Sequence, residues 1–235
     1  MKLLLLFTLF SMSGCGVIQI AEIKSPNVTA KDNAFEFNND TLRITYDFWA
    51  PQGILAFKIH NKLSVPIYID WGKSSCVYKG NKLDYWVDLS YDNSLIYYGN
   101  FLYKGQSSFF NATPTTSSLY NTQIAKQERI TFIPPGAEIV ISKFVLVPID
   151  RFNMDNVKQD KKGNKTIDIS YEQARYKFRN FLTYSVKENI SPEQYVDNEF
   201  YVGKVSELRA GNGEVVKENY PVKTPQRFYI APSAQ

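Results

Sequence analysis

Strict alternation of apolar and polar residues restricts the fold of this chain more than any other feature. Every second residue from Leu42 to Phe48 is apolar, and the pattern returns from Leu55 to Ile59. A period of two places one set of side chains on each face of a β-strand. The residues between the two segments, Ala50 to Gly53, have turn chemistry, so we expect the segments to pair as a hairpin.

Further short segments of the same kind follow, separated by turns rich in Pro, Gly, Asn and Ser. We expect strands at Ile67–Trp71, Arg129–Ile133, Glu138–Val147, Phe181–Val186, Phe200–Leu208 and Arg227–Ile230. Two capping boxes, beginning at Ser170 and Ser191, predict one or two short connecting helices. Because no βαβ rhythm is present, the predicted class is mainly β, an antiparallel β-sandwich with those helices as connectors.

The N-terminus has the three parts of a secretory signal. Lys2 supplies a positive charge, Leu3 to Phe10 form a short apolar run, and Ser11 to Gly14 lead to Cys15. Residues 12–15 (MSGC) resemble the lipobox of bacterial lipoproteins, although Leu is usual where Met12 stands. That resemblance implies that Cys15 is lipidated and becomes the first mature residue, while a plain signal peptide with an incidental cysteine is the alternative.

The expected organisation therefore has three parts. Residues 1–14 are a signal peptide, residues 15–34 a tether without clear periodicity, and residues 35–235 a single β-sandwich domain. The net charge of the chain is only +4, which predicts no strong polyanionic partner. No apolar run approaches the roughly 18 residues of a membrane span, so the lipid on Cys15 is the expected link to the membrane.

The scarcity of His and Cys removes most catalytic classes. His60 is the single histidine, and it lies on the polar face of its strand, where we expect it to face solvent. Cys76, the second of two cysteines, is expected to be a buried apolar residue in a strand. No catalytic residue, metal ligand or cofactor motif is found, so zinc, haem, iron–sulfur and nucleotide chemistry are not expected.

One enzymatic alternative stays open, because a two-carboxylate glycosidase can take its acid and base from anywhere in a chain. Asp70 beside Trp71 is one candidate carboxylate, and Asp84 with Asp88 is another pair. Asp residues at strand ends usually serve as turn or capping residues, which is the reading we favour.

An aromatic-rich excursion interrupts the strand pattern between residues 84 and 120, where 10 of 37 residues are aromatic. Flat rings beside Ser, Thr and Asn suit stacking on sugars or on a protein partner. The candidate ligand-binding residues are Trp86, Tyr91, Tyr97, Tyr98, Phe101 and Tyr103. The alternative, which we favour, is that these rings pack onto the sandwich.

Two weaker surface signals complete the pattern. Four lysines lie around a hairpin-tip sequence and predict a solvated loop: Lys158, Lys161, Lys162 and Lys165. Contact with anionic headgroups or phosphorylated glycans is the functional alternative for them. Thr41 follows Asp40 in a tripeptide that resembles an O-glycosylation acceptor, although an ordinary strand start explains it as well.

Two segments carry a family resemblance: Leu55 to Trp71 (LAFKIHNKLSVPIYIDW) and Ile133 to Glu138 (IPPGAE). They resemble uncharacterised cell-envelope lipoproteins of Bacteroidetes type that have an immunoglobulin-like β-sandwich. The resemblance implies that fold and a location in the envelope, most often at the outer membrane, and it implies no activity.

These observations predict a membrane-anchored envelope lipoprotein that works as a non-catalytic binding or assembly module. A glycan-binding domain that uses the aromatic segment is the first alternative, and a two-carboxylate hydrolase is the second. The expected partner is the membrane, through Cys15, with a glycan or an envelope protein as further candidates. Nucleic acid is not expected, because no basic stripe interleaved with aromatic rings runs along one element.

Overall fold

The structure is a computed structural model that describes residues 17–86, 128–147, 151–209 and 223–230. These residues form thirteen strands and no helix. The strands are β1 (Val17–Lys24), β2 (Thr29–Lys31), β3 (Ala34–Asn38), β4 (Leu42–Asp47), β5 (Ile54–Asn61), β6 (Ile67–Tyr78), β7 (Asn81–Asp84), β8 (Ile130–Ile133), β9 (Glu138–Val145), β10 (Lys165–Asp168), β11 (Lys177–Ser185), β12 (Gln194–Arg209) and β13 (Arg227–Ile230). The described residues contain no helix with the length and hydropathy of a membrane span.

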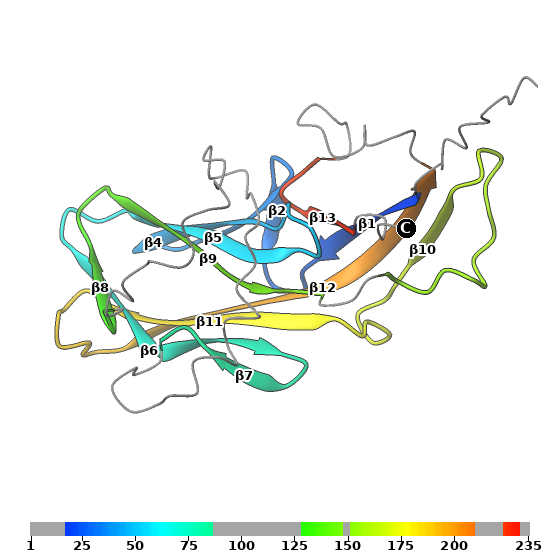
Figure 1. Ribbon diagram of the computed structural model, residues 1–235. Helices are drawn as coiled ribbons and strands as arrows, with labels where there is room; N and C mark the ends of the chain where they lie inside the picture. The colour runs from blue at the N-terminus through cyan, green and yellow to red at the C-terminus, as the bar shows by residue number, and fades with distance from the viewer. Residues whose placement is uncertain (1–16, 87–127, 148–150, 210–222, 231–235) are drawn as a thin grey trace, which may run out of the picture.

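The strands build two antiparallel sheets. The large sheet has eight strands in the order β13-β1-β12-β11-β6-β7, with β10 added to β12 and β8 added to β6. The small sheet has the order β2-β3-β4-β5-β9. Figure 1 shows the small sheet lying over β6, β11 and β12. The mainly β class with two antiparallel sheets is therefore confirmed, and the arrangement is consistent with a β-sandwich.

The alternation found in the sequence decides which side chains enter the core. Leu42, Ile44 and Tyr46 of β4 are at most 1% exposed, and β4 pairs with β5 along its whole length as the predicted hairpin. Phe57 and Ile59 of β5 are fully buried on the same side. Burial of one such side chain contributes about 1.5–3 kcal/mol, so this face alone accounts for much of the drive to form the small sheet.

A polar cluster lies at the centre of the core and joins the two sheets. Tyr46 of the small sheet accepts hydrogen bonds from the side-chain amides of Asn180, at 3.0 Å, and Asn198, at 2.7 Å. The Tyr85 hydroxyl donates to the side-chain oxygen of Asn180 at 2.8 Å. Asn180 and Asn198 face each other across β11 and β12. A buried polar group that loses its partner is costly, so this cluster favours one alignment of the sheets over others.

The prediction of a tether over residues 15–34 is wrong for most of its length. Residues Val17–Lys24 form β1, which pairs with β12 on one side and β13 on the other, and β2 and the start of β3 lie in the small sheet. Ile18 and Ile23 are buried. Four successive residues, 18–21, are buried, because side chains on both faces of β1 pack against apolar clusters. The strand therefore lacks the apolar–polar alternation that reveals a strand with one exposed face.

The two predicted helices are also wrong. After Ser170 the chain makes a single turn, with the Ala174 N–H bonded to the Tyr171 carbonyl at 3.3 Å, before β11 begins. After Ser191 there is no room for a helical turn, since Gln194 is already paired with Tyr184 as the first residue of β12. The residues that would continue each helix belong instead to strands β11 and β12 or lie directly before them.

Candidate functional site

The six aromatic residues proposed for ligand binding are only partly placed. Trp86 is half-buried and packs against the main core. Tyr91, Tyr97, Tyr98, Phe101 and Tyr103 lie outside the described residues. A sugar-binding platform in this segment therefore stays a prediction.

The described residues on either side of positions 87–127 lie in the same region of the fold. Tyr85 is 1% exposed, its ring centroid lies 5.5 Å from that of Trp71, and its carbonyl accepts a hydrogen bond from Lys143 at 2.5 Å. Trp71 donates its backbone N–H to the carbonyl of Arg129, at 2.8 Å, and its ring N–H to Thr131, at 2.9 Å. The core thus holds the residues before and after the excursion next to each other.

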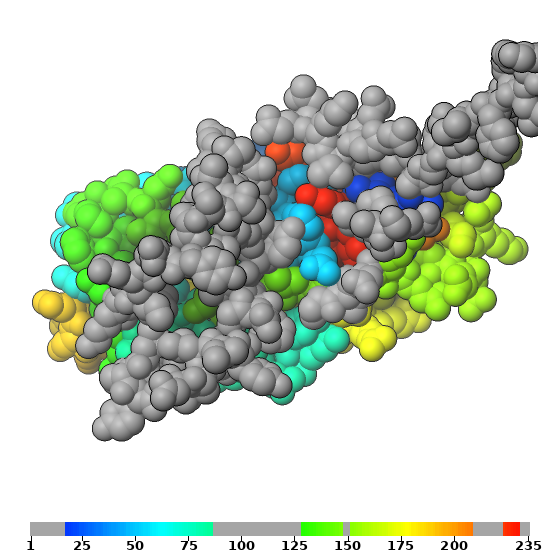
Figure 2. Space-filling model, in the orientation of Figure 1, coloured from blue at the N-terminus to red at the C-terminus, as the bar shows by residue number. Residues whose placement is uncertain are grey.

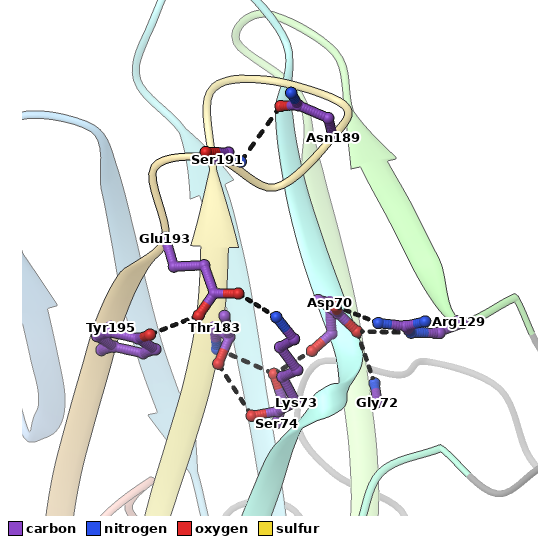
Figure 3. A network of polar contacts seen from close by, with 10 residues as sticks. All are labelled: Asp70, Gly72, Lys73, Ser74, Arg129, Thr183, Asn189, Ser191, Glu193 and Tyr195. Carbon is purple, nitrogen blue, oxygen red and sulfur yellow. Dashed lines mark hydrogen bonds and ion pairs between the residues drawn. The ribbon is translucent and has the colours of Figure 1, made fainter.

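Asp70, one of the candidate carboxylates, belongs to a polar network at one end of the large sheet (Figure 3). Its carboxylate is 1% exposed and receives two hydrogen bonds from Arg129, at 3.0 and 3.2 Å, and one from the backbone N–H of Gly72, at 3.0 Å. The same carboxylate raises the pKa of Arg129 through the hydrogen bonds. These bonds give Asp70 a structural role at the start of β8.

The network surrounds a register shift in β6 where this strand pairs with β11. Ser74 donates to the Asp70 carbonyl at 2.6 Å and accepts the backbone N–H of Thr183 at 3.0 Å, and Thr183 donates to the Lys73 carbonyl at 2.9 Å. The side chains of Lys73 and Glu193 pair above it (Figure 3). We call these residues, with Asp70, Gly72, Arg129 and Tyr195, the paired network, because each of its charges has an opposite partner.

The other candidate residues have ordinary structural roles or lie outside the described part. Asp84 forms an ion pair with Lys82 at 2.5 Å, and Asp88 is outside the described residues. Cys76 is buried as predicted, and burial raises its pKa to about 12. His60 is half-buried on the outer side of the small sheet, between Arg43 and Glu138 in register.

The lysine-rich segment forms the solvated hairpin tip that its sequence predicts. The Asp160 side chain accepts backbone N–H groups from Lys162 and Asn164, at 2.8 and 2.9 Å, and Gly163 has a positive φ of 79°. Lys158, Lys161 and Lys162 are exposed, whereas Lys165 binds the Met154 carbonyl at 2.9 Å.

A cationic pocket, which the sequence did not point to, lies at the opposite end of the outer face of the large sheet. It encloses about 320 Å³ and is lined by Val77, Lys79, Gly80, Arg175, Lys177, Phe178, Arg179 and Glu199. Four cations and one carboxylate line it, so the pocket concentrates a net +3 in a chain whose whole net charge is +4. A surface concavity of one sign attracts ligands of the other.

Local structure fixes each cation of this pocket. Lys79 and Gly80 are the two residues between β6 and β7, and both have positive φ, 50° and 82°, as a type I′ hairpin turn requires. Lys177 and Arg179 are alternate residues of β11 on its outer side. Arg175 ends the turn that precedes β11. Figure 2 shows the yellow segment that leads into β11 between the teal surface of β7 and the yellow-green surface around β10.

Tyrosine rings position the cations without using their hydrogen-bond donors. The Lys79 ammonium lies 4.5 Å from the centre of the Tyr176 ring, and the Arg175 guanidinium lies 5.9 Å from the same ring. Lys177 lies 4.1 Å from the Tyr171 ring. A cation over an aromatic face is attracted by about 0.5–1 kcal/mol at an exposed site. The N–H groups stay available to an oxyanion.

Charge pairing at the pocket is incomplete. Arg179 pairs with Asp197, and Glu199 accepts the Tyr171 hydroxyl at 2.6 Å. Among the residues that the structure describes, no carboxylate forms an ion pair with Lys79, Arg175 or Lys177. These three cations therefore lie at one pocket without an ion pair of their own, although Glu199 also lines the pocket and Glu172 interacts electrostatically with Lys177.

A second, apolar pocket lies on the other side of Arg175. It encloses about 350 Å³ and is lined by Arg151, Phe152, Asn153, Met154, Ile167, Ile169, Gln173, Arg175, Tyr176, Val202 and Val205. Tyr176 separates the two pockets, since its ring faces Lys79 and Arg175 and also contacts Phe152, with centroids 5.6 Å apart. Arg175 is the residue common to both linings.

Sequence reasoning missed this region for an identifiable reason. The expected strand began at Phe181, four residues after the observed start of β11, and a helix was expected from Ser170. The alternation of Lys177 and Arg179 was the available signal, but their meeting with Lys79 depends on the pairing of β6 with β11. Comparison of the chain with protein-family models, curated proteins and solved structures found no match.

Within the described ranges, no three His, Cys, Asp or Glu side chains are grouped as a metal site would need. The chemistry that the region offers is non-covalent binding of an anion by lysine and arginine donors beside apolar side chains.

Proposed function

We propose that this chain is a lipid-anchored envelope protein of immunoglobulin-like architecture that acts as a non-catalytic, anion-binding module. Lipidation at Cys15 holds it at the membrane, and the cationic pocket is the binding site. The observation that carries the binding half is the convergence of Lys79, Arg175 and Lys177 on tyrosine rings with no paired carboxylate among the described residues.

Several features support a binding role for this pocket. Unpaired cations held close together repel one another, so they lower the stability of the free protein and gain energy when an anion arrives. The tyrosine contacts hold the cations in place before binding, which reduces the entropy cost of binding. The pocket volume, about 320 Å³, lies in the range of small-molecule sites.

The anchoring half is tested with Cys15→Ala, using detergent phase partitioning and membrane fractionation of cells that express the full chain. Wild type is expected in the detergent phase and the membrane fraction, and Cys15→Ala in the aqueous phase, because a diacylated cysteine supplies the stable anchor. The matched control is Cys76→Ala, which removes the other cysteine. Membrane retention of Cys15→Ala equal to that of wild type overturns the anchoring half.

The binding half is tested by calorimetric titration of the full chain carrying Cys15→Ala with inorganic phosphate, galacturonate and octanoate. At least one of these anions is expected to bind, and its affinity to fall with added salt and with Arg175→Gln. Lys161→Gln, at the exposed loop tip, removes one positive charge elsewhere and is expected to leave binding unchanged. If none of the anions binds, or if Arg175→Gln and Lys161→Gln behave alike, the binding half is wrong.

A further inference from the structure

We infer that the ligand is a small amphipathic anion, with its oxyanion head in the cationic pocket and its apolar chain in the neighbouring apolar pocket. This inference rests on the proposed anion-binding function and names the ligand class for that site. Its basis is the position of Arg175, which lines a pocket of positive charge on one side and a pocket of apolar side chains on the other.

The apolar pocket opens directly from the main core. Met154, Val202 and Val205 are buried members of the core cluster, and Phe152 and Ile169 pack against it. Ile167 of β10, which also lines the pocket, is 39% exposed. A hydrocarbon chain that covers these side chains removes apolar surface from water, and each buried CH₂ group contributes about 0.8 kcal/mol.

Backbone hydrogen bonds hold both walls of this pocket before any ligand binds. The buried Gln19 side chain donates to the Phe152 carbonyl at 2.9 Å and accepts the Phe152 N–H at 2.7 Å. On the other wall, the Ile169 N–H binds the Gly203 carbonyl at 2.9 Å, and the Val202 N–H binds the Tyr176 carbonyl at 3.0 Å. A site formed in advance binds more tightly than one that must be ordered by its ligand.

A buried hydroxyl without a partner lies near the cations, although it lines neither pocket. The Tyr78 hydroxyl is the one buried side-chain polar atom in the described ranges that has no hydrogen-bond partner. Its ring lies 5.2 Å from the Lys79 ammonium. Burial without a partner costs about 1–3 kcal/mol, so this hydroxyl lowers the stability of the protein as it stands.

The two pockets together favour a ligand with a charged head and an apolar chain over simpler ligands. A purely hydrophilic anion leaves the apolar pocket uncovered, and an uncharged hydrocarbon leaves Lys79, Arg175 and Lys177 uncompensated. An oxyanion with an attached chain satisfies both. Two sources share this chemistry, a free fatty acid with a carboxylate head and a lipid-derived monoester with a phosphate head.

The test is a chain-length series measured by calorimetry with the full chain carrying Cys15→Ala. Acetate, butanoate, hexanoate and octanoate are compared with octan-1-ol, and inorganic phosphate is compared with octyl phosphate, all below their micelle-forming concentrations. Affinity is expected to rise about tenfold for each added pair of CH₂ groups that enters the pocket. Octan-1-ol, which lacks the charge, is expected to bind at least about tenfold more weakly than octanoate.

Two variants separate the head from the chain. Arg175→Gln is expected to weaken every anion in the series by a similar factor of about ten, leaving the dependence on chain length intact. Ile167→Asn, an uncharged change at an exposed position of β10, is expected to flatten the dependence on chain length while acetate is unaffected. Lys161→Gln is the control that changes neither. Circular dichroism verifies that the variants are folded.

The outcomes separate this inference from the function on which it rests. If acetate or phosphate binds as tightly as its octyl counterpart and still depends on Arg175, the amphipathic ligand is wrong and the anion-binding function stands. If no member of the series binds but galacturonate does, the amphipathic ligand alone is wrong, and if galacturonate does not bind either, both are wrong. If the octyl anions bind with the expected dependences, the inference is supported, and the tighter of octanoate and octyl phosphate identifies the source of the ligand.

Discussion

The two ends of the outer face of the large sheet differ in whether their charged side chains form ion pairs. In the paired network, Asp70 binds Arg129 and Lys73 binds Glu193 (Figure 3). In the cationic pocket, Lys79, Arg175 and Lys177 rest on tyrosine rings and have no paired carboxylate in the described part of the chain. Paired charges at a β-bulge stabilise the fold, whereas converging unpaired charges are suited to a ligand. The difference predicts that breaking the pair of the buried Asp70 at the first end changes stability, whereas substitutions at the second end change binding.

The largest effect is expected from Arg129→Ala. This change leaves the buried carboxylate of Asp70 without its cation and lowers the free energy of unfolding by about 3 kcal/mol. Urea denaturation measures the loss, and octanoate binding at the other end is expected to persist. The double variant Asp70→Asn/Arg129→Ala is expected to recover part of the stability, since no buried charge is then left over. A loss below about 0.5 kcal/mol in the single variant contradicts a structural role for the pair.

The core polar cluster gives the next largest effect. Tyr46→Phe removes the acceptor for the amides of Asn180 and Asn198 and is expected to lower the free energy of unfolding by about 2 kcal/mol. Tyr184→Phe, which removes a hydroxyl that accepts from the half-buried Asn39, is the matched comparison with a smaller loss. Equal losses in the two variants contradict the central importance of the Tyr46 cluster.

Cys76, on the inner side of β6 between the two ends, gives a pH-dependent effect. Its folded pKa is raised from 9.0 to about 12 by burial, so the folded state keeps a proton that the unfolded state loses. Stability from this group is complete below about pH 9 and falls by up to about 1.4 kcal/mol per pH unit between pH 9 and 12. Subtracting the pH profile of Cys76→Ala from that of wild type isolates this contribution from the buried tyrosines. A difference that is flat above pH 9 contradicts it.

The smallest effect on stability is expected from exposed charges at either end. Lys73→Gln breaks the surface pair with Glu193 and is expected to leave the unfolding midpoint unchanged, as is usual for solvent-exposed ion pairs. Arg175→Gln is expected to raise that midpoint slightly, because it removes one of three cations that repel one another, while octanoate binding falls. Thermal unfolding with and without octanoate reports both quantities. If octanoate stabilises Arg175→Gln but not Lys73→Gln, the assignment of binding to the cationic pocket is contradicted.

Much of the fold follows from local sequence, and its exceptions have local causes. The hairpin of β4 and β5 and the limits of β13 agree with the alternation and the turn residues. Strand β1 was missed because both of its faces are buried, so it shows no regular alternation of apolar and polar residues. The capping boxes at Ser170 and Ser191 satisfied a local rule for helices, but the pairing of β11 with β12 overrode it.

The site was less predictable, because its residues come together only through strand pairing. In the sequence, Lys79 lies nearly a hundred residues before Arg175 and Lys177. No short motif links the three. Trp86 was a candidate ligand-binding residue because it is aromatic, but it packs against the core. Asp70 was a candidate acid because it adjoins Trp71, but it binds Arg129. Local composition indicates where side chains could act, and the register of β6 against β11 decides which of them meet.

A chemical-shift map of octanoate binding to the ¹⁵N-labelled full chain carrying Cys15→Ala tests the difference between the two ends most directly. The expected result is a set of perturbed amides confined to both pockets, at Lys79, Arg175, Lys177, Ile167 and Val202. Amides of the paired network, at Gly72, Lys73 and Arg129, are expected to stay unchanged. Perturbations centred on the paired network, with the pocket amides unmoved, would contradict the assignment of the ligand to the unpaired end.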